Sequence, residues 1–347
     1  MKPWGVQLSP AGKRRWAVFK NNKRSFWGLI VFVVLFCISM ASELIANDRP
    51  ILISYKNSLY FPAFKVYPET VFGGDFDTAT NYQDSYIQNI IESDGWIIWP
   101  PIPYSYYTHI KNLPQPAPTA PNLNNWLGTD DQARDVMARV LYGFRISIFF
   151  AFSLAIGSAI IGISVGALQG YFGGKLDLLG QRFLEIWSSL PVLFLLIILA
   201  SIITPGFWWL LGIMLLFEWT TLVDVVRAEF LRGRNLDYVR AARALGVSNR
   251  LIIMRHILPN AMVASITFLP FLLTGAITTL TSLDFLGFGL PSGSPSLGEL
   301  VAQGKNNLQA PWLALSAFGV LSLMLTLLVF IGEGVRDAFD PRMLNNR

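Results

Sequence analysis

The sequence predicts an all-α, polytopic integral membrane protein with six transmembrane helices. The first observation is its composition: of 347 residues, 53% are hydrophobic and 14% are charged, whereas a soluble chain carries roughly 25% charged residues. The second is a set of separate apolar stretches, each near the roughly 20 residues that a bilayer-spanning helix needs. They are residues 26–46, 146–166, 184–203, 207–226, 261–283 and 312–332. Together these features exclude a disordered chain, a coiled coil and a small disulfide scaffold.

The distribution of Lys and Arg predicts how the helices are oriented. The tail at residues 1–25 has basic residues and no acidic residue, and the loop at residues 227–260 is also basic. Acidic residues outnumber basic ones in residues 47–144. Because Lys and Arg concentrate in short cytoplasmic flanks, we expect the tail and the loop in the cytoplasm and residues 47–144 outside. Six spans then return the C-terminal tail, residues 333–347, to the cytoplasm. The net charge of +5 reflects this bias and does not indicate nucleic-acid binding.

Three details of the spans carry further predictions. Residues 26–46 are too long for a signal-peptide core and no small-residue cleavage site follows them, so we expect a retained first transmembrane helix. Only residues 204–206 separate the third and fourth stretches, which predicts a tight turn. Pro191 and Pro270 fall inside spans and predict kinks, which neighbouring helices can accommodate.

The external insertion, residues 47–144, is rich in Tyr, Trp, Asn, Asp and Pro. The proline-rich run at residues 114–121 predicts an extended spacer, and residues 130–141 predict a helix on the membrane surface. Two interpretations of the insertion remain open. It is either a small structured segment packed on the membrane face or a docking surface for an external partner or ligand.

The loop at residues 227–260 predicts two short helices separated by a glycine. Asn235 can cap the first helix, and Gly246 can end it because a left-handed residue costs little only for glycine. Ser248 can cap the second helix, which Pro259 is expected to end. A loop that only links two spans needs a few residues. Two capped helices therefore indicate a role beyond linkage.

The sequence contains no motif for bond chemistry. The run from Gly170 to Lys175 is similar to a phosphate-binding loop, but the required G-x-x-x-x-G-K-[ST] pattern is absent. The single Cys37 cannot form an intrachain disulfide, and the two histidines, His109 and His256, are far apart in the sequence. We therefore expect no catalytic residue, no metal site and no cofactor bound by this chain.

Ionisable residues inside spans are candidates for function. Glu185 can pair with Arg182 and Asp224 with Arg227, each three residues away. Glu218 has no such local partner. These carboxylates keep open an ion-coupled carrier that works alone, although the inverted repeats typical of carriers are not visible.

The loop resembles the EAA loop of the membrane subunits of ABC importers. Its first helix and glycine read Tyr238-Val239-Arg240-Ala241-Ala242-Arg243-Ala244-Leu245-Gly246, and its end reads His256-Ile257-Leu258-Pro259-Asn260. Residues 127–136, 142–147 and 332–342 resemble the C-type permease of oligopeptide and dipeptide importers. The long insertion resembles the Yej-type branch, which is associated with peptides and microcin C. The resemblance covers the N-terminal span and almost everything from residue 126 onward.

The resemblance implies a type I ABC importer permease fold, with a core of five helices at residues 145–332. It implies a bacterial inner-membrane subunit that pairs with a second, B-type permease. Two cytoplasmic ATP-binding subunits would use ATP and bind the loop, a periplasmic peptide-binding protein would deliver cargo, and membrane lipid would surround the pair. The implied ATPase-coupling residues are Tyr238, Arg240, Ala241, Ala242, Leu245, Gly246, His256, Leu258 and Pro259.

Two residues depart from the family pattern, and the cargo stays open. Arg240 stands where the EAA pattern has Glu, and Ala133 stands where a Gly usually precedes the Arg-Asp pair. The first departure reverses a charge at the expected ATPase contact, and the second affects a local turn. Another cargo, such as nickel, remains an alternative to peptides.

Overall fold

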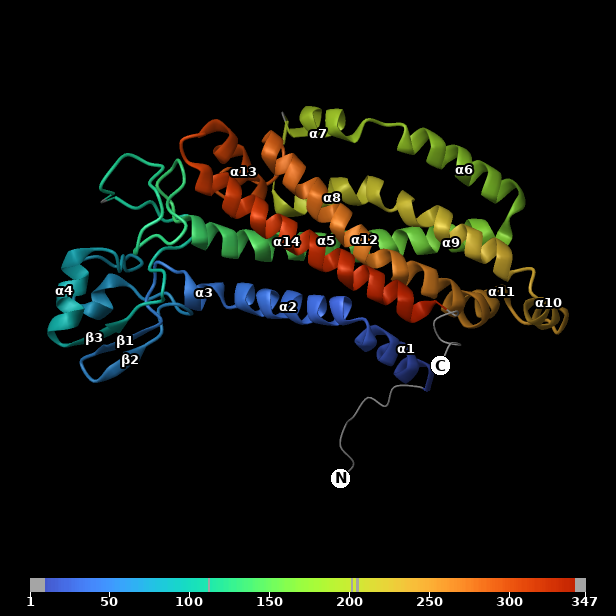
Figure 1. Ribbon diagram of the computed structural model, residues 1–347, viewed down its shortest axis with the longest axis horizontal. Coiled ribbons are helices and arrows are strands. Elements are labelled where there is room, and N and C mark those ends of the chain that lie inside the picture. Colours follow the sequence, from blue (N-terminus) through green and yellow to red (C-terminus); the bar gives the residue numbers. More distant parts are fainter. Residues whose placement is uncertain (1–9, 112, 201, 204–205, 341–347) are drawn as a thin grey trace, which may run out of the picture. The chain divides into compact units, whose positions relative to one another are not determined.

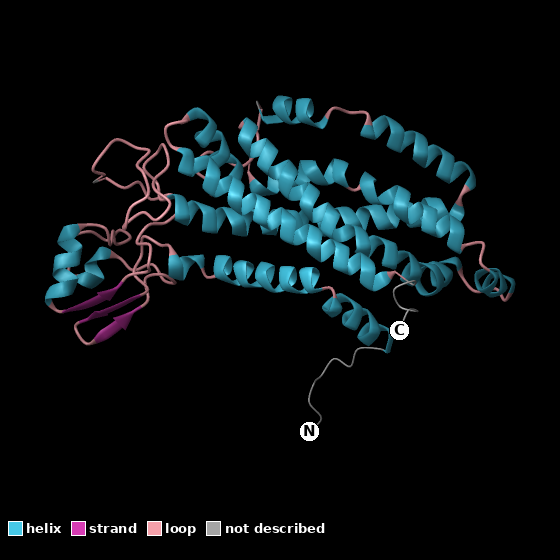
Figure 2. Cartoon of the chain, viewed as in Figure 1, coloured by secondary structure: helices cyan, strands magenta, loops and turns pink. Residues whose placement is uncertain are grey.

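A computed structural model describes residues 10–111, 113–200, 202–203 and 206–340. The chain is largely helical (Figure 1, Figure 2), which confirms the predicted all-α class. Contacts divide it into two compact units, which are described separately. The first contains Met1–Val33, Ile148–Leu280 and Leu323–Arg347, and the second contains Val34–Ser147 and Thr281–Ser322. The turn predicted at residues 204–206 and the tail motif from residue 341 onward fall mainly or wholly outside the described residues.

Five helical segments of the described chain are long and apolar enough to cross a membrane. They are α2 (Lys23–Met40), α5 (Val136–Phe172), α8 with α9 (Phe207–Glu218 and Thr220–Gly233), Asn249–Leu286, and α14 (Pro311–Phe339). The pair α6 (Gly174–Ser188) and α7 (Val192–Ala200) forms a sixth span if its two helices are counted together. These helices bend by 60° at a break that contains Pro191. The kink predicted there is confirmed.

In the first unit, α5 and α9 pack with their backbones in close approach. Gly162, Gly166 and Gly170 follow one another at four-residue spacing on α5. A Cβ atom on them would lie 2.6, 2.7 and 2.6 Å from three carbonyl oxygens, respectively those of Trp219 just before α9 and of Val223 and Arg227 within it. Small residues at this spacing let membrane helices approach closely. The spacing therefore fixes which face of α5 meets α9.

The second unit contains a small sheet that the sequence did not reveal. Strands β1 (Leu52–Tyr55), β2 (Ser58–Tyr60) and β3 (Gly95–Ile98) form an antiparallel sheet in the order β2-β1-β3. Its core also takes in the 3-10 helix η1 (Glu69–Phe72) and α4 (Ser85–Ser93). The core residues are Ile53, Tyr55, Phe72, Tyr82, Ile87 and Ile91.

The sheet escaped prediction because its strands are short and its hairpin turn is unusual. Lys56 and Asn57 connect β1 to β2, both with positive φ, 47° and 60°. Two central residues with positive φ are typical of a tight hairpin turn, which Asn-Gly or Asp-Gly usually signals. Lys-Asn does not carry that signal, and strands of three or four residues show little alternation.

A buried ionic cluster holds the second unit together near the start of α5. Arg134 Nε lies 2.7 Å from Asp130 Oδ2, and Arg134 Nη2 lies 3.1 Å from Glu299 Oε1. Arg139 Nη2 lies 3.0 Å from Glu299 Oε2. Glu299 belongs to α13 (Leu297–Asn306), so the cluster joins segments far apart in sequence. The two arginines and Asp130 are 1% exposed or less.

The turn before α5 shows why glycine would suit position 133, where this chain has alanine. Ala133 has a φ of 60°, a left-handed conformation that costs an L-residue roughly 1–2 kcal/mol. Glycine would adopt it without that cost. The turn also corrects the helix expected at residues 130–141, because α5 begins only at Val136.

Candidate functional site

The first helix of the EAA-like loop, α10 (Asp237–Ala244), ends at a glycine with a left-handed backbone. Gly246 has a φ of 77°, which confirms the expected conformation. The N–H of Gly246 donates to the carbonyl of Arg243 at 3.0 Å, and the N–H of Val247 donates to that of Ala242 at 3.1 Å. This pair of bonds is the Schellman motif. It fixes the direction in which the chain leaves the helix.

The inner face of α10 is anchored in a hydrophobic core. Val239 is fully buried and Ala242 is 9% exposed. They pack with Tyr171 of α5, Phe230 of α9 and other apolar residues of the same cluster. The helix is therefore held on the ends of membrane helices and does not float on a flexible linker.

Polar contacts complete this anchor. The hydroxyl of Tyr171 donates to Asn249 Oδ1 at 2.6 Å, and the guanidinium carbon of Arg243 lies 5.4 Å from the centre of the Tyr171 ring. Arg234 Nη1 donates to the carbonyls of Gly170 and Tyr171, both at 3.3 Å. Tyr171 and Arg234 were not among the predicted residues, because nothing in the local pattern connects them to the loop.

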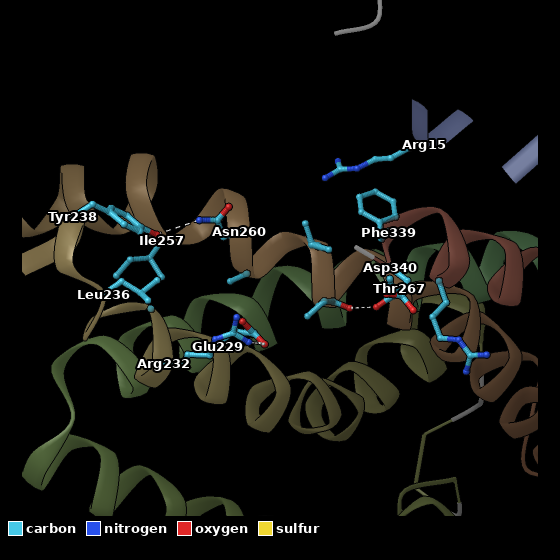
Figure 3. Close-up of a pocket in the computed structure, with 15 residues that line it drawn as sticks. Arg15, Glu229, Arg232, Leu236, Tyr238, Ile257, Asn260, Thr267, Phe339 and Asp340 are labelled. Atoms are coloured by element: carbon cyan, nitrogen blue, oxygen red, sulfur yellow. Dashed lines mark hydrogen bonds and ion pairs between the residues drawn. The ribbon is translucent and has the colours of Figure 1, made fainter. Parts of the chain in front are cut away.

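A second anchor joins α10 to the start of α12 (Leu258–Leu286). The Tyr238 hydroxyl donates to the carbonyl of His256 at 3.3 Å. Asn260 Nδ2 donates to the Tyr238 hydroxyl oxygen at 3.2 Å, drawn as a dashed line in Figure 3. Two of the predicted residues, Tyr238 and His256, therefore meet across 18 positions of sequence.

The outer face of α10 is exposed and includes the small side chain of Ala241. Arg240 and Ala241 are exposed, and the side chain of Leu245 is 84% exposed at the end of the helix. Ala241 and Leu245 are four residues apart and so lie on the same side. Pro259 is exposed and Leu258 is half-buried against the core. The predicted residues thus divide between an anchor and an accessible contact face.

Two predictions about the loop helices are wrong, those for Asn235 and Pro259, and the prediction for Ser248 is confirmed in position only. Asn235 Nδ2 donates to the carbonyl of Leu231 at 3.0 Å instead of capping α10, whose N-cap is Leu236. Ser248 occupies the N-cap of α11 (Asn249–Leu251) but makes no side-chain capping bond. Pro259 does not end the second helix.

The helix passes Pro259 because the preceding turn is wide. After α11, residues Ile252–Ile257 form a π-helical turn, η2, and α12 then continues to Leu286. Proline removes a backbone donor and crowds the turn before it. A π turn relaxes the regular hydrogen-bond ladder, so the irregularity is absorbed there. The loop therefore leads directly into a membrane-length helix.

A cavity of about 600 Å³ opens beside the loop in the first unit (Figure 3). Leu236, Tyr238 and Asn260 line one part of it. Its charged lining residues are Arg15, Glu229, Arg232, Arg336 and Asp340. In the described part of the chain, no three His, Cys, Asp or Glu side chains are grouped to hold a metal ion.

Ion pairs between helices of the first unit differ partly from the expected local pairs. Arg182 and Glu185 form the predicted pair, 2.5 Å apart. Arg227 does not pair with Asp224 as expected. Its Nη2 lies 2.8 Å from Asp177 Oδ2 on α6. This contact spans 50 positions, so i to i+3 spacing could not reveal it.

Membrane-length helices, joined through a firmly anchored loop with an exposed contact face, define a membrane transport subunit. The chain belongs to the family of binding-protein-dependent transport system inner membrane components, whose sequence profile matches residues 138–345. It is therefore a transport subunit of the inner membrane and not an enzyme. Members of this family work with further subunits and a binding protein.

Three relatives illustrate the similarity. The chain is 59% identical over 366 aligned positions to the "Peptidoglycan transport system permease protein YejE" of Agrobacterium fabrum. This alignment covers 98% of this chain and 95% of that protein. It is 58% identical over 335 residues to the "Inner membrane ABC transporter permease protein YejE" of Escherichia coli, covering 96% and 98%. It is 35% identical over 241 residues to the "Oligopeptide transport system permease protein OppC" of Haemophilus influenzae, covering 69% and 77%.

These relationships favour a permease over a carrier that works alone. Glu218, the carboxylate considered for proton coupling, is half-buried and has no hydrogen bond or ion pair to another described residue. No relative named above is an ion-coupled carrier. Glu218 therefore keeps no assigned role.

Proposed function

We propose that the chain is the C-type half of an ATP-driven importer of oligopeptides or peptide-like compounds, and that its loop couples transport to ATP hydrolysis in other subunits. The observation that carries this proposal is the division of the loop into a buried anchor and an exposed face. A helix fixed on the ends of α5 and α9 can transmit a displacement to them. A loosely tethered helix would absorb that displacement.

The proposed assembly has three kinds of partner. A second, B-type permease completes the pathway, two cytoplasmic ATP-binding subunits bind the coupling loops, and a periplasmic peptide-binding protein delivers cargo. ATP is used by the partners and no cofactor is bound by this chain. Peptide cargo is supported by the names of the oligopeptide and peptidoglycan transport relatives.

Docking of the ATP-binding subunits is expected to depend on the small size of Ala241. Ala241→Trp places a large side chain on the exposed face of α10, where it blocks close approach without disturbing the buried face. The measurement is the amount of ATP-binding subunit that co-purifies with the permease pair from membranes. We expect a loss of about tenfold or more, which corresponds to roughly 1.4 kcal/mol of binding free energy.

Ala120→Trp is the matched control, because Ala120 is also exposed but lies in the external insertion. This variant should keep its ATP-binding subunits. Both variants should still pair with the second permease. Full retention of the ATP-binding subunits by Ala241→Trp would argue against α10 as the docking element.

The proposed orientation places both termini and the loop in the cytoplasm, and it predicts a labelling pattern. In a Cys37→Ser background, single cysteines replace the exposed residues Ser58, Thr78 and Asn235. A membrane-impermeant thiol reagent on intact spheroplasts should label the first two only. All three should react after permeabilisation. Labelling of the thiol at position 235 in intact spheroplasts would contradict the proposed topology.

A further inference from the structure

Two cavities of different chemistry adjoin at the N-terminal helix α1 (Pro10–Asn21). The first is the 600 Å³ cavity beside the coupling loop, which three arginines and two acidic residues help to line. The second has a volume of about 430 Å³ and, apart from Arg15, an apolar lining. Its larger side chains are Trp16, Phe19, Leu29, Ile331, Val335 and Phe339. Arg15 and Phe339 line both cavities.

The apolar cavity is a fixed groove, because α1 and the start of α2 are packed tightly on α14. A Cβ atom on Gly334 would lie 2.3 Å from Ser25 Cβ and 2.9 Å from Phe19 Cε2, so no larger residue fits there without movement. Asn22 Nδ2 also donates to Asp337 Oδ2 at 3.3 Å. Phe19 is buried, and the Trp16 ring stacks on it with centroids 5.7 Å apart.

Arg15 connects the groove to the polar cavity. Its guanidinium carbon lies 4.3 Å from the centre of the Phe339 ring, and Figure 3 shows the two side chains next to each other. Arg15 Nε is buried and has no hydrogen-bond partner among the described residues. A positive donor therefore lies at the junction between apolar and polar space.

The surroundings of the junction are strongly basic. Helix α1 also contains the exposed residues Lys13, Arg14 and Lys20 and no acidic residue. Basic pockets beside membrane helices attract anionic lipid headgroups, and aromatic rings such as Trp16 favour the membrane interface. An apolar groove that ends at a cationic donor matches a molecule with a hydrocarbon chain and an anionic head.

We propose that this paired cavity binds one anionic phospholipid of the surrounding leaflet. An acyl chain lies in the groove between α1 and α14, and the phosphate group contacts Arg15 and enters the polar cavity, which Arg336 also lines. Because Leu236 and Tyr238 line the same polar cavity, the lipid headgroup lies beside the coupling loop. The site goes beyond the proposed transport function and does not depend on the cargo.

The test is photo-cross-linking on the assembled transporter. The complex is reconstituted in nanodiscs that contain phosphatidylglycerol with a diazirine in its acyl chain, irradiated, digested and analysed by mass spectrometry. Adducts are expected on α1 and α14, at the groove residues. A phosphatidylcholine probe with the same chain should label these residues much less. Arg15→Gln should lower phosphatidylglycerol labelling roughly fivefold, as expected for one charge worth about 1 kcal/mol at a membrane surface.

Arg14→Gln is the matched control. It removes the same charge from the neighbouring position of α1, but Arg14 is exposed and lines neither cavity. Val335→Trp fills the groove without changing the charge, and it should remove the α14 adducts. Equal losses in Arg15→Gln and Arg14→Gln, or equal labelling by both lipids, would overturn the site. None of these results depends on transport, so they are independent of the proposed function.

Discussion

Gly246→Val is expected to insert and to pair with the second permease as the native chain does, but to lose nearly all peptide uptake. Nothing lies within 4 Å of a Cβ atom built on Gly246, so the substitution causes no collision. Its cost is the backbone strain of a β-branched residue at a φ of 77°, on the order of 1–2 kcal/mol. That is too little to unfold packed membrane helices. It is enough to open the Schellman motif and displace α10 from its partner.

The measurement is uptake and binding-protein-stimulated ATP hydrolysis in reconstituted vesicles at matched subunit levels. Gly246→Asn is the first control, because asparagine also tolerates the left-handed region, and it should keep most of the activity. Gly212→Val is the second control, since a Cβ there also meets no atom within 4 Å but the residue lies inside helix α8. Normal uptake by Gly246→Val would remove the case for a coupling loop.

Arg134→Met is expected to destabilise the protein more than any surface change. The variant leaves Asp130, which has no exposed area, with the Arg139 guanidinium at 3.5 Å as its remaining cation in the cluster, and it removes one of the two cations on Glu299. Breaking a buried ion pair by deleting one partner costs roughly 3–5 kcal/mol. The expected result is a large fall in the thermal unfolding midpoint of the purified complex, together with reduced levels in the membrane.

Arg182→Met tests whether burial causes this loss. Arg182 pairs with Glu185, but the side chains are 73% and 60% exposed. Exposed pairs contribute roughly 0–1 kcal/mol, so this variant should unfold near the native midpoint. Similar midpoints for Arg134→Met and the native complex would show that the cluster does not stabilise the second unit.

Features that depend on local chain geometry were predictable from the sequence. The left-handed Gly246 is one, because only glycine adopts that conformation cheaply, and the pair Arg182–Glu185 is another, because its members are one helical turn apart. The apolar runs predicted the helices for the same reason. Inside a bilayer, an apolar run of the required length can satisfy its own backbone hydrogen bonds by forming a helix.

Features that depend on contacts between distant segments were not predictable. Arg227 has Asp224 nearby in sequence but pairs with Asp177 on another helix, and local spacing gives no sign of this choice. The cluster of Asp130 and Glu299 joins segments more than 160 positions apart, as the 165-residue separation of Arg134 and Glu299 shows. Pro259 was expected to end a helix, yet the π turn before it let the helix continue.

The glycine ladder between α5 and α9 also determines where this part of the chain can bend. At three successive turns the side chains of Leu222, Val226 and Phe230 on α9 lie directly against the α5 backbone, so the α5 side of the contact has no side chains that could rearrange as the two helices slide. They therefore act as a single stiff lever, and the loop helix α10 is fastened to its end through Phe230 and Tyr171. The helical path of the first unit is also interrupted by the 60° break between α6 and α7. We expect a force applied at the loop to rotate the α5–α9 pair as one body, with the bend angle able to change at that break.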